Sequence, residues 1–244
     1  DGYSLLLHHI GMSTAPAVYR RLSIDPLKDF EYIGLINEVP MTFLVRKDLP
    51  PNNIKELVPY IAANKDKLTL ANAGIGSASH LCGLLFMSAI DTPLTTVPYK
   101  GAAPAITDLI GGQVDMLCDQ TTNTTAHIKA GKVKALALTT PKALATLPGL
   151  APMADSGVPA LAGFNVSVWH ALYAPKGTPK EVVDKLSAAL QQSLKNPDLI
   201  KRFAELGTEP VPAEKATPAA LQTFLTAEIA KWTPIIRKAN IYAD

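Results

Sequence analysis

The chain has 244 residues, of which 48% are hydrophobic and 18% charged, so it can bury a sizeable core as one large domain or two smaller ones. Its 23 Lys and Arg stand against 21 Asp and Glu, and the net charge of +2 with no basic run argues against nucleic acid or an anionic membrane as partner. No apolar stretch reaches the roughly 18 residues that a transmembrane helix needs.

The first 64 residues are expected to form short strands and helices. They are a strand at 3–8, a helix or turn at 15–21, strands at 32–36 and 41–46, and a helix at 53–64. Pro40 separates two of these strands, and the proline-rich segment 48–51 suggests a boundary between lobes. Asn53 and Glu56 have the spacing of a capping box, although Pro59 weakens the helix that they open.

Residues 68–140 alternate between strand-like and helix-like runs. Strands are expected near 68–72, 95–99, 113–118 and 133–139, with helices near 77–90, 102–110 and 122–130. Such alternation indicates a parallel sheet with crossover helices. Since the carboxyl ends of parallel strands share one edge, the small polar turns that follow these strands should line a single crevice.

The remainder begins with a loop rich in Pro and Ala at 141–163, followed by a long strand at 164–174 of the kind that can cross between lobes. Thr178, Pro179 and Glu181 predict a helix start, with Thr178 as the N-cap. Apolar residues then recur at helical spacing to Leu194. Further helices are expected from Pro197 to near 207 and at 218–239.

The turn from Gly74 to His80 is the clearest candidate for ligand binding. Its glycines let backbone N–H groups approach a ligand, Ser77 can cap the next helix, and the helix N-terminus favours an anion. A Gly-x-Gly-Ser turn also occurs where nothing binds, so the residues alone leave both interpretations open. The turn matches neither the dinucleotide fingerprint nor a Walker loop.

Several other residues near the strand ends have both a structural and a binding interpretation. Lys100 could direct a charge into the crevice or be solvated, and Asp119 could cap the next turn or accept a ligand donor. Trp169 could form a wall of the crevice or pack in the core. Because strand neighbours alternate, only one of His8 and His9 should face the crevice, and His9 lies closer to the strand end.

Evidence for catalysis is weak. Ser77 and His80 lie three residues apart, which allows a serine nucleophile with a nearby base, but the Gly-x-Ser-x-Gly elbow is absent and helix capping explains Ser77 more simply. The histidines lack metal-ligand spacing. Cys82 and Cys118 lie in apolar segments, which favours two buried free thiols over a disulfide.

Motifs spread along almost the whole chain resemble the Bug-type receptors, the extracytoplasmic solute-binding proteins of tripartite tricarboxylate transporters. They are the segments 1–6, 29–33, 74–81, 97–105, 112–115, 131–137, 169–175 and 177–179. The resemblance implies a periplasmic binding protein of type II, with two α/β lobes joined by two crossing strands near 38–47 and 164–174. Residues 1–45 plus 165–244 would form lobe one and residues 46–164 lobe two.

The resemblance also implies the activity. A periplasmic protein, expected to be a monomer without cofactor or metal, would capture a small carboxylate (a dicarboxylate, tricarboxylate or aromatic carboxylate) between its lobes. It would deliver the solute to the transporter's membrane components. A ligand-sensing effector domain and a hydrolase using Ser77 remain as alternatives. The expected ligand-binding residues are Gly74, Gly76, Ser77, Ala78, Ser79, His80, Tyr99, Lys100, Gly101, Asp119, Gln120, His9 and Trp169.

In this family a second carboxylate-binding turn lies upstream of the Asp1-Gly2-Tyr3 motif. The resemblance therefore implies that the chain is N-terminally incomplete, lacking a strand, a helix and a strand of lobe one, and with them half of the carboxylate clamp.

Overall fold

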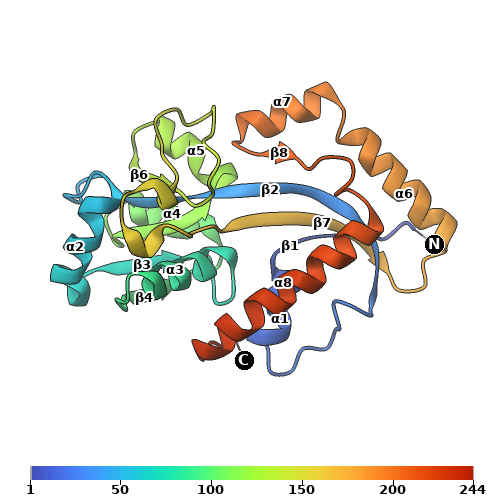
Figure 1. The fold of residues 1–244 in the computed structure, drawn as a ribbon, viewed down its shortest axis with the longest axis horizontal. Coiled ribbons are helices and arrows are strands. Elements are labelled where there is room, and N and C mark those ends of the chain that lie inside the picture. The colour runs from blue at the N-terminus through green and yellow to red at the C-terminus, as the bar shows by residue number, and fades with distance from the viewer. Residues whose placement is uncertain (1, 244) are drawn as a thin grey trace. The chain divides into compact units, whose positions relative to one another are not determined.

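A computed structural model describes residues 2–243, and its contacts divide the chain into two compact units (Figure 1). Unit 1 comprises the residues up to Glu38 and those from Val168 on, and unit 2 comprises Val39–Ser167. Strand β2 (Phe30–Arg46) runs through both, where two separate strands were expected. Pro40 does not interrupt it, because the recorded pairings of β2 with β5, β6 and β8 all leave this residue out, so its missing N–H costs none of those ladders a bond.

The sheet of unit 2 contains four strands that run in one direction: β3 (Thr69–Asn72), β4 (Thr95–Pro98), β5 (Met116–Gln120) and β6 (Val133–Leu138). β3 is parallel to β4 and β5, whereas β2 lies antiparallel between β5 and β6. The expected parallel alignment is therefore correct for these four strands, but the sheet is mixed. Strand pairing across distant segments was not readable from periodicity.

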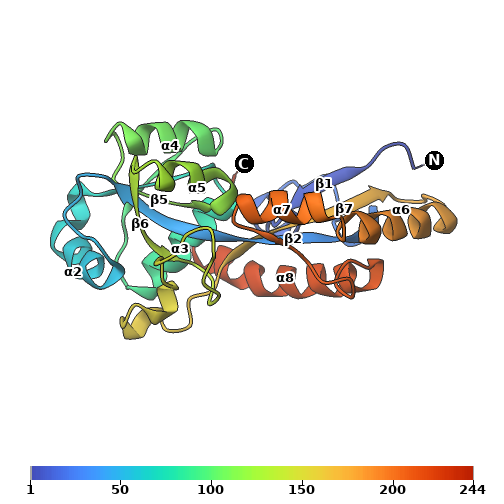
Figure 2. The same ribbon diagram turned by 90° about the horizontal axis from the view of Figure 1, so that it is seen from above.

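Four helices belong to unit 2, namely α2 (Ile54–Asn64), α3 (Ala78–Ala89), α4 (Ala102–Ile110) and α5 (Thr121–Lys129). Figure 2 shows α3 on one side of the sheet and α4 with α5 on the other. Alternating strand residues account for this arrangement. Leu44 and Leu117 pack in the cluster that includes α4, whereas Phe43 contacts Phe86 of α3 with ring centroids 4.3 Å apart.

Cys82 of α3 and Cys118 of β5 form a disulfide, so the expectation of two free thiols is wrong. Both residues are fully buried, as expected, but the strand and the helix bring their Cα atoms within 6.1 Å, which suits a disulfide. Thirty-six positions separate the two cysteines in sequence, a spacing that carried no signal of pairing.

Unit 1 contains β1 (Leu6–His9), all but the first residue of β7 (Ser167–Pro175), the short β8 (Glu209–Pro210) and its part of β2. β1 is antiparallel to β7, and β8 is antiparallel to β2. The helices of this unit are α1 (Gly11–Val18), α6 (Lys180–Ser193), α7 (Pro197–Glu205) and α8 (Pro218–Lys238). α1 was expected several residues later; it begins directly after β1 and packs against α8.

The predicted helix starts differ in outcome. Asn53 caps α2 by accepting the Glu56 amide at 2.8 Å, as expected. Thr178 does not cap α6, which begins at Lys180 after Pro179. Its hydroxyl donates instead to the Pro175 carbonyl at 2.8 Å and stabilises the preceding turn. The remaining short elements are 3-10 turns at Lys65–Lys67, Met153–Asp155 and Pro159–Leu161.

Candidate anion-binding site

The turns that follow the four aligned strands of unit 2 share one edge of the sheet. The Tyr99 amide donates to the Asn72 carbonyl at 2.9 Å and the Gly101 amide to the Ala73 carbonyl at 3.2 Å, which holds the turns after β3 and β4 side by side. At the ends of β5 and β6, Asp119 and Leu138 both lie opposite Thr42 of β2. The common edge predicted from sequence is confirmed.

The turn between β3 and α3 is fixed by its own side chains. Gly74 and Gly76 adopt φ angles of +123° and +75°, which L-residues rarely adopt. The Asn72 side chain accepts the Gly74 amide and His80 Nδ1 accepts the Gly76 amide, each at 3.0 Å. The Ser77 amide donates to the Gly74 carbonyl at 3.1 Å. Three backbone donors are thus used to shape the turn.

Two other donors of this turn lack an acceptor. Ser77 Oγ accepts the His80 amide at 3.2 Å, but the amides of Ala78 and Ser79 have no acceptor within residues 2–243. No acidic side chain lies in the first turn of α3 or of α4, so neither helix dipole is compensated there. An anion with two oxygens suits the Ala78 and Ser79 amides.

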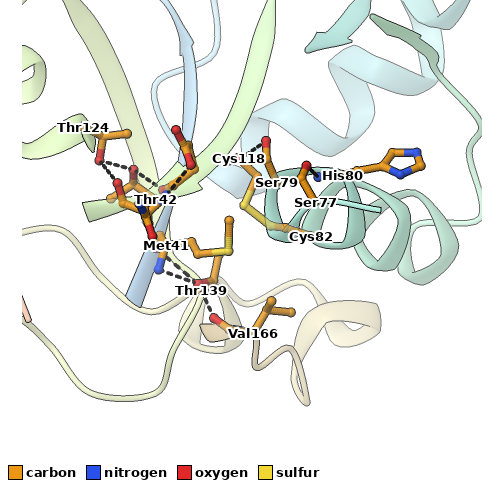
Figure 3. Close-up of a disulfide and its surroundings, with 12 residues drawn as sticks. Met41, Thr42, Ser77, Ser79, His80, Cys82, Cys118, Thr124, Thr139 and Val166 are labelled. Atoms are coloured by element: carbon orange, nitrogen blue, oxygen red, sulfur yellow. Dashed lines mark hydrogen bonds between the residues drawn. A yellow bond between two sulfur atoms is a disulfide. The ribbon is translucent and has the colours of Figure 1, made fainter. Parts of the chain in front are cut away.

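The serine side chains of this turn already have partners (Figure 3). Ser79 Oγ donates to the Cys118 carbonyl at 2.6 Å and Ser77 Oγ caps α3. The His80 nitrogen for which a partner is recorded, Nδ1, accepts from Gly76 rather than from Ser77. This arrangement argues against Ser77 as a nucleophile activated by His80.

His80 is a neutral acceptor at Nδ1. Its ring is largely buried, and desolvation lowers its pKa below the ordinary value of 6.5. Accepting the Gly76 N–H through Nδ1 places the ring proton on Nε2.

Asp119 is a buried carboxyl group at the end of β5. Its Oδ1 accepts the Gln120 amide at 2.8 Å and its Oδ2 accepts the Asn123 side chain at 3.2 Å. Burial raises the pKa of Asp119 to about 6, although both hydrogen bonds act in the opposite direction. Both of the roles left open by the sequence therefore remain available, since it stabilises the start of α5 and each of its oxygens retains a free lone pair.

Buried threonines beneath this edge were missed in the sequence (Figure 3). Thr42 Oγ1 donates to the Asp119 carbonyl at 3.2 Å and lies 2.8 Å from the Thr124 hydroxyl. Thr139 Oγ1 accepts the Met41 amide at 3.0 Å and donates to the Val166 carbonyl at 2.6 Å. These hydroxyls hold the strand ends in place, and only the polar residues that follow β6 and open α5 hinted at them.

Three further residues of unit 2 that were predicted to bind the ligand differ in the groups that they can present to it. The Tyr99 hydroxyl donates to Asp108 Oδ2 at 2.6 Å, and burial followed by this carboxylate raises the Tyr99 pKa to about 12. Gln120 uses its backbone, donating to Asp119 and accepting from Thr124. Lys100 is exposed and precedes Gly101, the N-cap of α4.

His9 and Trp169 belong to unit 1. His9 Nδ1 accepts the Gly11 amide at 3.1 Å, and desolvation, followed by the charges of His8 and His170, lowers its pKa to about 4. The rings of His8 and His9 stack with centroids 4.6 Å apart, although burial alternates along β1 through His9. That only one of the two faces a ligand stays a prediction. Trp169 is 1% exposed and packs on Phe224, in accordance with the core interpretation.

Two further features of the described residues concern metal binding and membrane insertion. Among residues 2–243 no group of three or more His, Cys, Asp and Glu side chains could hold a metal ion. Over the same residues, no helix has the length and apolar character required to cross a bilayer.

Comparison with known proteins identifies close relatives. The profile of a family described as "Tripartite tricarboxylate transporter family receptor" matches residues 1–241. A UPF0065 protein from the ttuE-ttuC' intergenic region of Agrobacterium vitis is 49% identical, over 98% of this chain and 68% of its own length. The solved structure of the periplasmic binding protein BugD is 51% identical, with a TM-score of 0.91 over 99% of this chain and 79% of its own.

Two Rhodopseudomonas palustris structures contain ligands. MatC with bound malate is 34% identical, with a TM-score of 0.88 over 97% of this chain and 80% of its own. A second protein, solved with adipate, is 32% identical, with a TM-score of 0.91 over 99% of this chain and 79% of its own. These similarities show the α/β fold of periplasmic binding proteins.

Proposed function

Because this chain belongs to the tripartite tricarboxylate transporter receptor family of periplasmic solute-binding proteins, we propose that it binds a small dicarboxylate through the turn between β3 and α3. It is a receptor and not an enzyme, so the hydrolase alternative is set aside, and so is the effector-domain alternative. Relatives were solved with malate and with adipate, which indicates the class of solute to test.

The amides of Ala78 and Ser79 carry this proposal. They are donors without acceptors at the positive end of α3, next to a turn in which Asn72 and His80 accept the Gly74 and Gly76 amides. A carboxylate placed there would accept two N–H groups, and such charge-assisted hydrogen bonds are about twice as strong as neutral ones. The donors are fixed before the ligand arrives, which lowers the ordering cost of binding.

Asp119 and Lys100 extend the site along the same edge in this proposal. Asp119 would accept a hydrogen bond from a hydroxyl or amine of the solute, or donate one when protonated, and an ionised Asp119 would repel a second carboxylate. Lys100 would attract the anion from the rim. Tyr99 and Trp169 are proposed to contact the ligand only through their backbones. The Tyr99 side chain donates to Asp108, and the Trp169 side chain donates to Glu228. Gly101 and Gln120 complete the edge.

The proposal includes the lobes that the resemblance implies, residues 1–45 plus 165–244 and residues 46–164, joined by two crossing strands and closing on the solute. His9 would then serve as donor to the distal end of the ligand. The protein is proposed to act as a monomer that presents the closed form to the membrane components of a tripartite transporter. Small-angle scattering with and without ligand tests closure, and a radius of gyration that does not change would contradict it.

Isothermal titration with malate, succinate, aspartate and adipate tests the binding itself. We expect at least one to bind, and malate or aspartate to bind more tightly than succinate if Asp119 accepts from the solute. Asp119→Asn should reduce that preference. The matched control is Asp115→Asn, because Asp115 lies at the other end of β5, where it binds Thr69 and Arg46. A wild-type protein that binds none of the four would contradict the proposed solute class.

A further inference from the structure

Two contacts fasten the first turn of α3 to the end of β5. Ser79 Oγ donates to the Cys118 carbonyl at 2.6 Å, and Cys82, three residues later on the same face of the helix, forms the disulfide with Cys118 (Figure 3). All three residues are at most 2% exposed. A single strand residue thus receives both attachments of the helix.

Cys118 occupies a special place in the sheet. The pairing of β5 with β3 covers only Met116 and Leu117, so Cys118 lies beyond it on that side. The next residue is Asp119, and the residue before Ser79 is Ala78. The paired attachment therefore joins the start of α3, which carries the free amides, to the strand residue that precedes Asp119.

Further along α3, packing holds the helix independently. Phe86 packs on Phe43 with tilted rings whose centroids lie 4.3 Å apart, and Gly83 lies so close to β3 that a Cβ there would come within 2.8 Å of Leu70. The helix beyond Cys82 is thus held by apolar packing of its own. Loss of the attachments to Cys118 would loosen its first turn selectively.

We propose that the Cys82–Cys118 disulfide and the Ser79 hydroxyl act together as a positioning device that sets the Ala78 and Ser79 amides relative to Asp119, and so determines solute affinity. This proposal rests on the proposed function for its ligand readout. Binding groups must be held to within about 0.5 Å by their supporting contacts to keep full affinity. We expect either attachment alone to hold the turn, so the two should be strongly coupled.

A double-mutant cycle tests the coupling. The variants are Ser79→Ala, the pair Cys82→Ala with Cys118→Ala, and all three together, each titrated with the tightest-binding dicarboxylate of the panel well below its melting temperature. We expect the first two to weaken binding about threefold or less, and the combination to weaken it by about tenfold more than their product, a coupling within the range seen for contacting residues. Leu109→Ala, a fully buried residue of α4, controls for lost stability alone.

Amide hydrogen exchange gives a readout that needs no ligand. In the triple variant, the Leu81 amide, which donates to the Ser77 carbonyl at 2.9 Å, should exchange much faster, while the Ile90 amide, which donates to Phe86 at 3.0 Å, should change little. Exchange that rises equally at both amides, or multiplicative effects on affinity, would overturn the positioning role. Selective exchange in a protein that binds no panel member would instead contradict only the proposed function.

Discussion

His80 accepts the backbone amide of Gly76 through its Nδ1 atom at 3.0 Å, so a side chain in the first turn of α3 shapes the loop that precedes its own helix. His9 does the same in unit 1, where its Nδ1 accepts the Gly11 amide at 3.1 Å. In both units a neutral imidazole fixes the turn between a strand and a helix.

Replacing His80 should therefore weaken solute binding. His80→Phe removes the hydrogen bond that the Gly76 amide donates to Nδ1, and we expect about tenfold weaker binding, as for a lost hydrogen bond of about 1.4 kcal/mol. Titration calorimetry with malate or adipate measures the change, with His127→Phe on α5 as control. An unchanged Kd in His80→Phe would show that the turn keeps its shape without this bond.

Acid should destabilise the fold through the same histidines. Desolvation lowers the pKa of His80 below 6.5 and that of His9 to about 4 in the folded protein. As the pH falls, these two histidines therefore become protonated in the unfolded chain before they do so in the folded one. The contribution of these histidines to the free energy of unfolding is therefore full above pH 6.5. It is lost as the pH falls from 6.5 through the lowered pKa values. Urea denaturation at pH 7.5, 6 and 5 should show this decline, and His9→Gln should make it shallower. An identical decline in His9→Gln would contradict the assignment.

Asp119 should make the stability of the fold depend on pH in the opposite direction, so that acid stabilises the protein through this residue. Its pKa of about 6 exceeds the ordinary 3.8, so the native state holds its proton more strongly, and stability falls as the pH rises from 3.8 through about 6. A rise of this size corresponds to roughly 3 kcal/mol once the group is ionised. Asp119→Asn should stabilise the protein by about 1–3 kcal/mol at pH 7.5 and by little at pH 4, as measured by urea denaturation. Destabilisation at pH 7.5 would show that the carboxylate hydrogen bonds outweigh burial.

Gly74→Ala should damage the site more than a comparable change elsewhere. Gly74 has φ +123°, and a Cβ there would lie 3.3 Å from the Tyr99 carbonyl oxygen. Gly149 also has positive φ, at +87°, but a Cβ there would meet nothing within 4 Å. Gly149→Ala therefore measures strain alone, about 1 kcal/mol. Thermal unfolding and solute titration should show a larger loss for Gly74→Ala, and equal losses would contradict the close approach.

Glu228 should be important for the stability of unit 1. Its Oε2 accepts Trp232 Nε1 at 2.9 Å and Trp169 Nε1 at 3.3 Å. Glu228→Ala leaves two buried indole donors unpaired and should cost about 3 kcal/mol, while Glu228→Gln keeps an acceptor and should cost about 1 kcal/mol. Glu205→Ala, which removes only an exposed pair with Arg202, should change stability by about 0.5 kcal/mol or less. Equal losses in all three would contradict this role.

The sequence predicted the alternation of strands and helices in residues 68–140 and the turn from Gly74 to Ser79, because periodicity and glycine spacing are local signals. It could not predict that β2 lies between β5 and β6, since pairing of distant strands leaves no local mark. The same reason explains the missed Cys82–Cys118 disulfide and the missed partners of Thr42. Trp169 was ambiguous because an apolar strand residue has the same pattern whether it faces a ligand or Phe224.

The amide signals of Ala78 and Ser79 during titration with malate or adipate test the central claim most directly. In a ¹H–¹⁵N correlation spectrum, a bound carboxylate should shift these two amide protons downfield by more than any others in unit 2. The amides of Gly112 and Gly131, which precede β5 and β6 at the other end of the sheet, should stay unchanged. Binding that leaves the Ala78 and Ser79 signals in place would contradict the account.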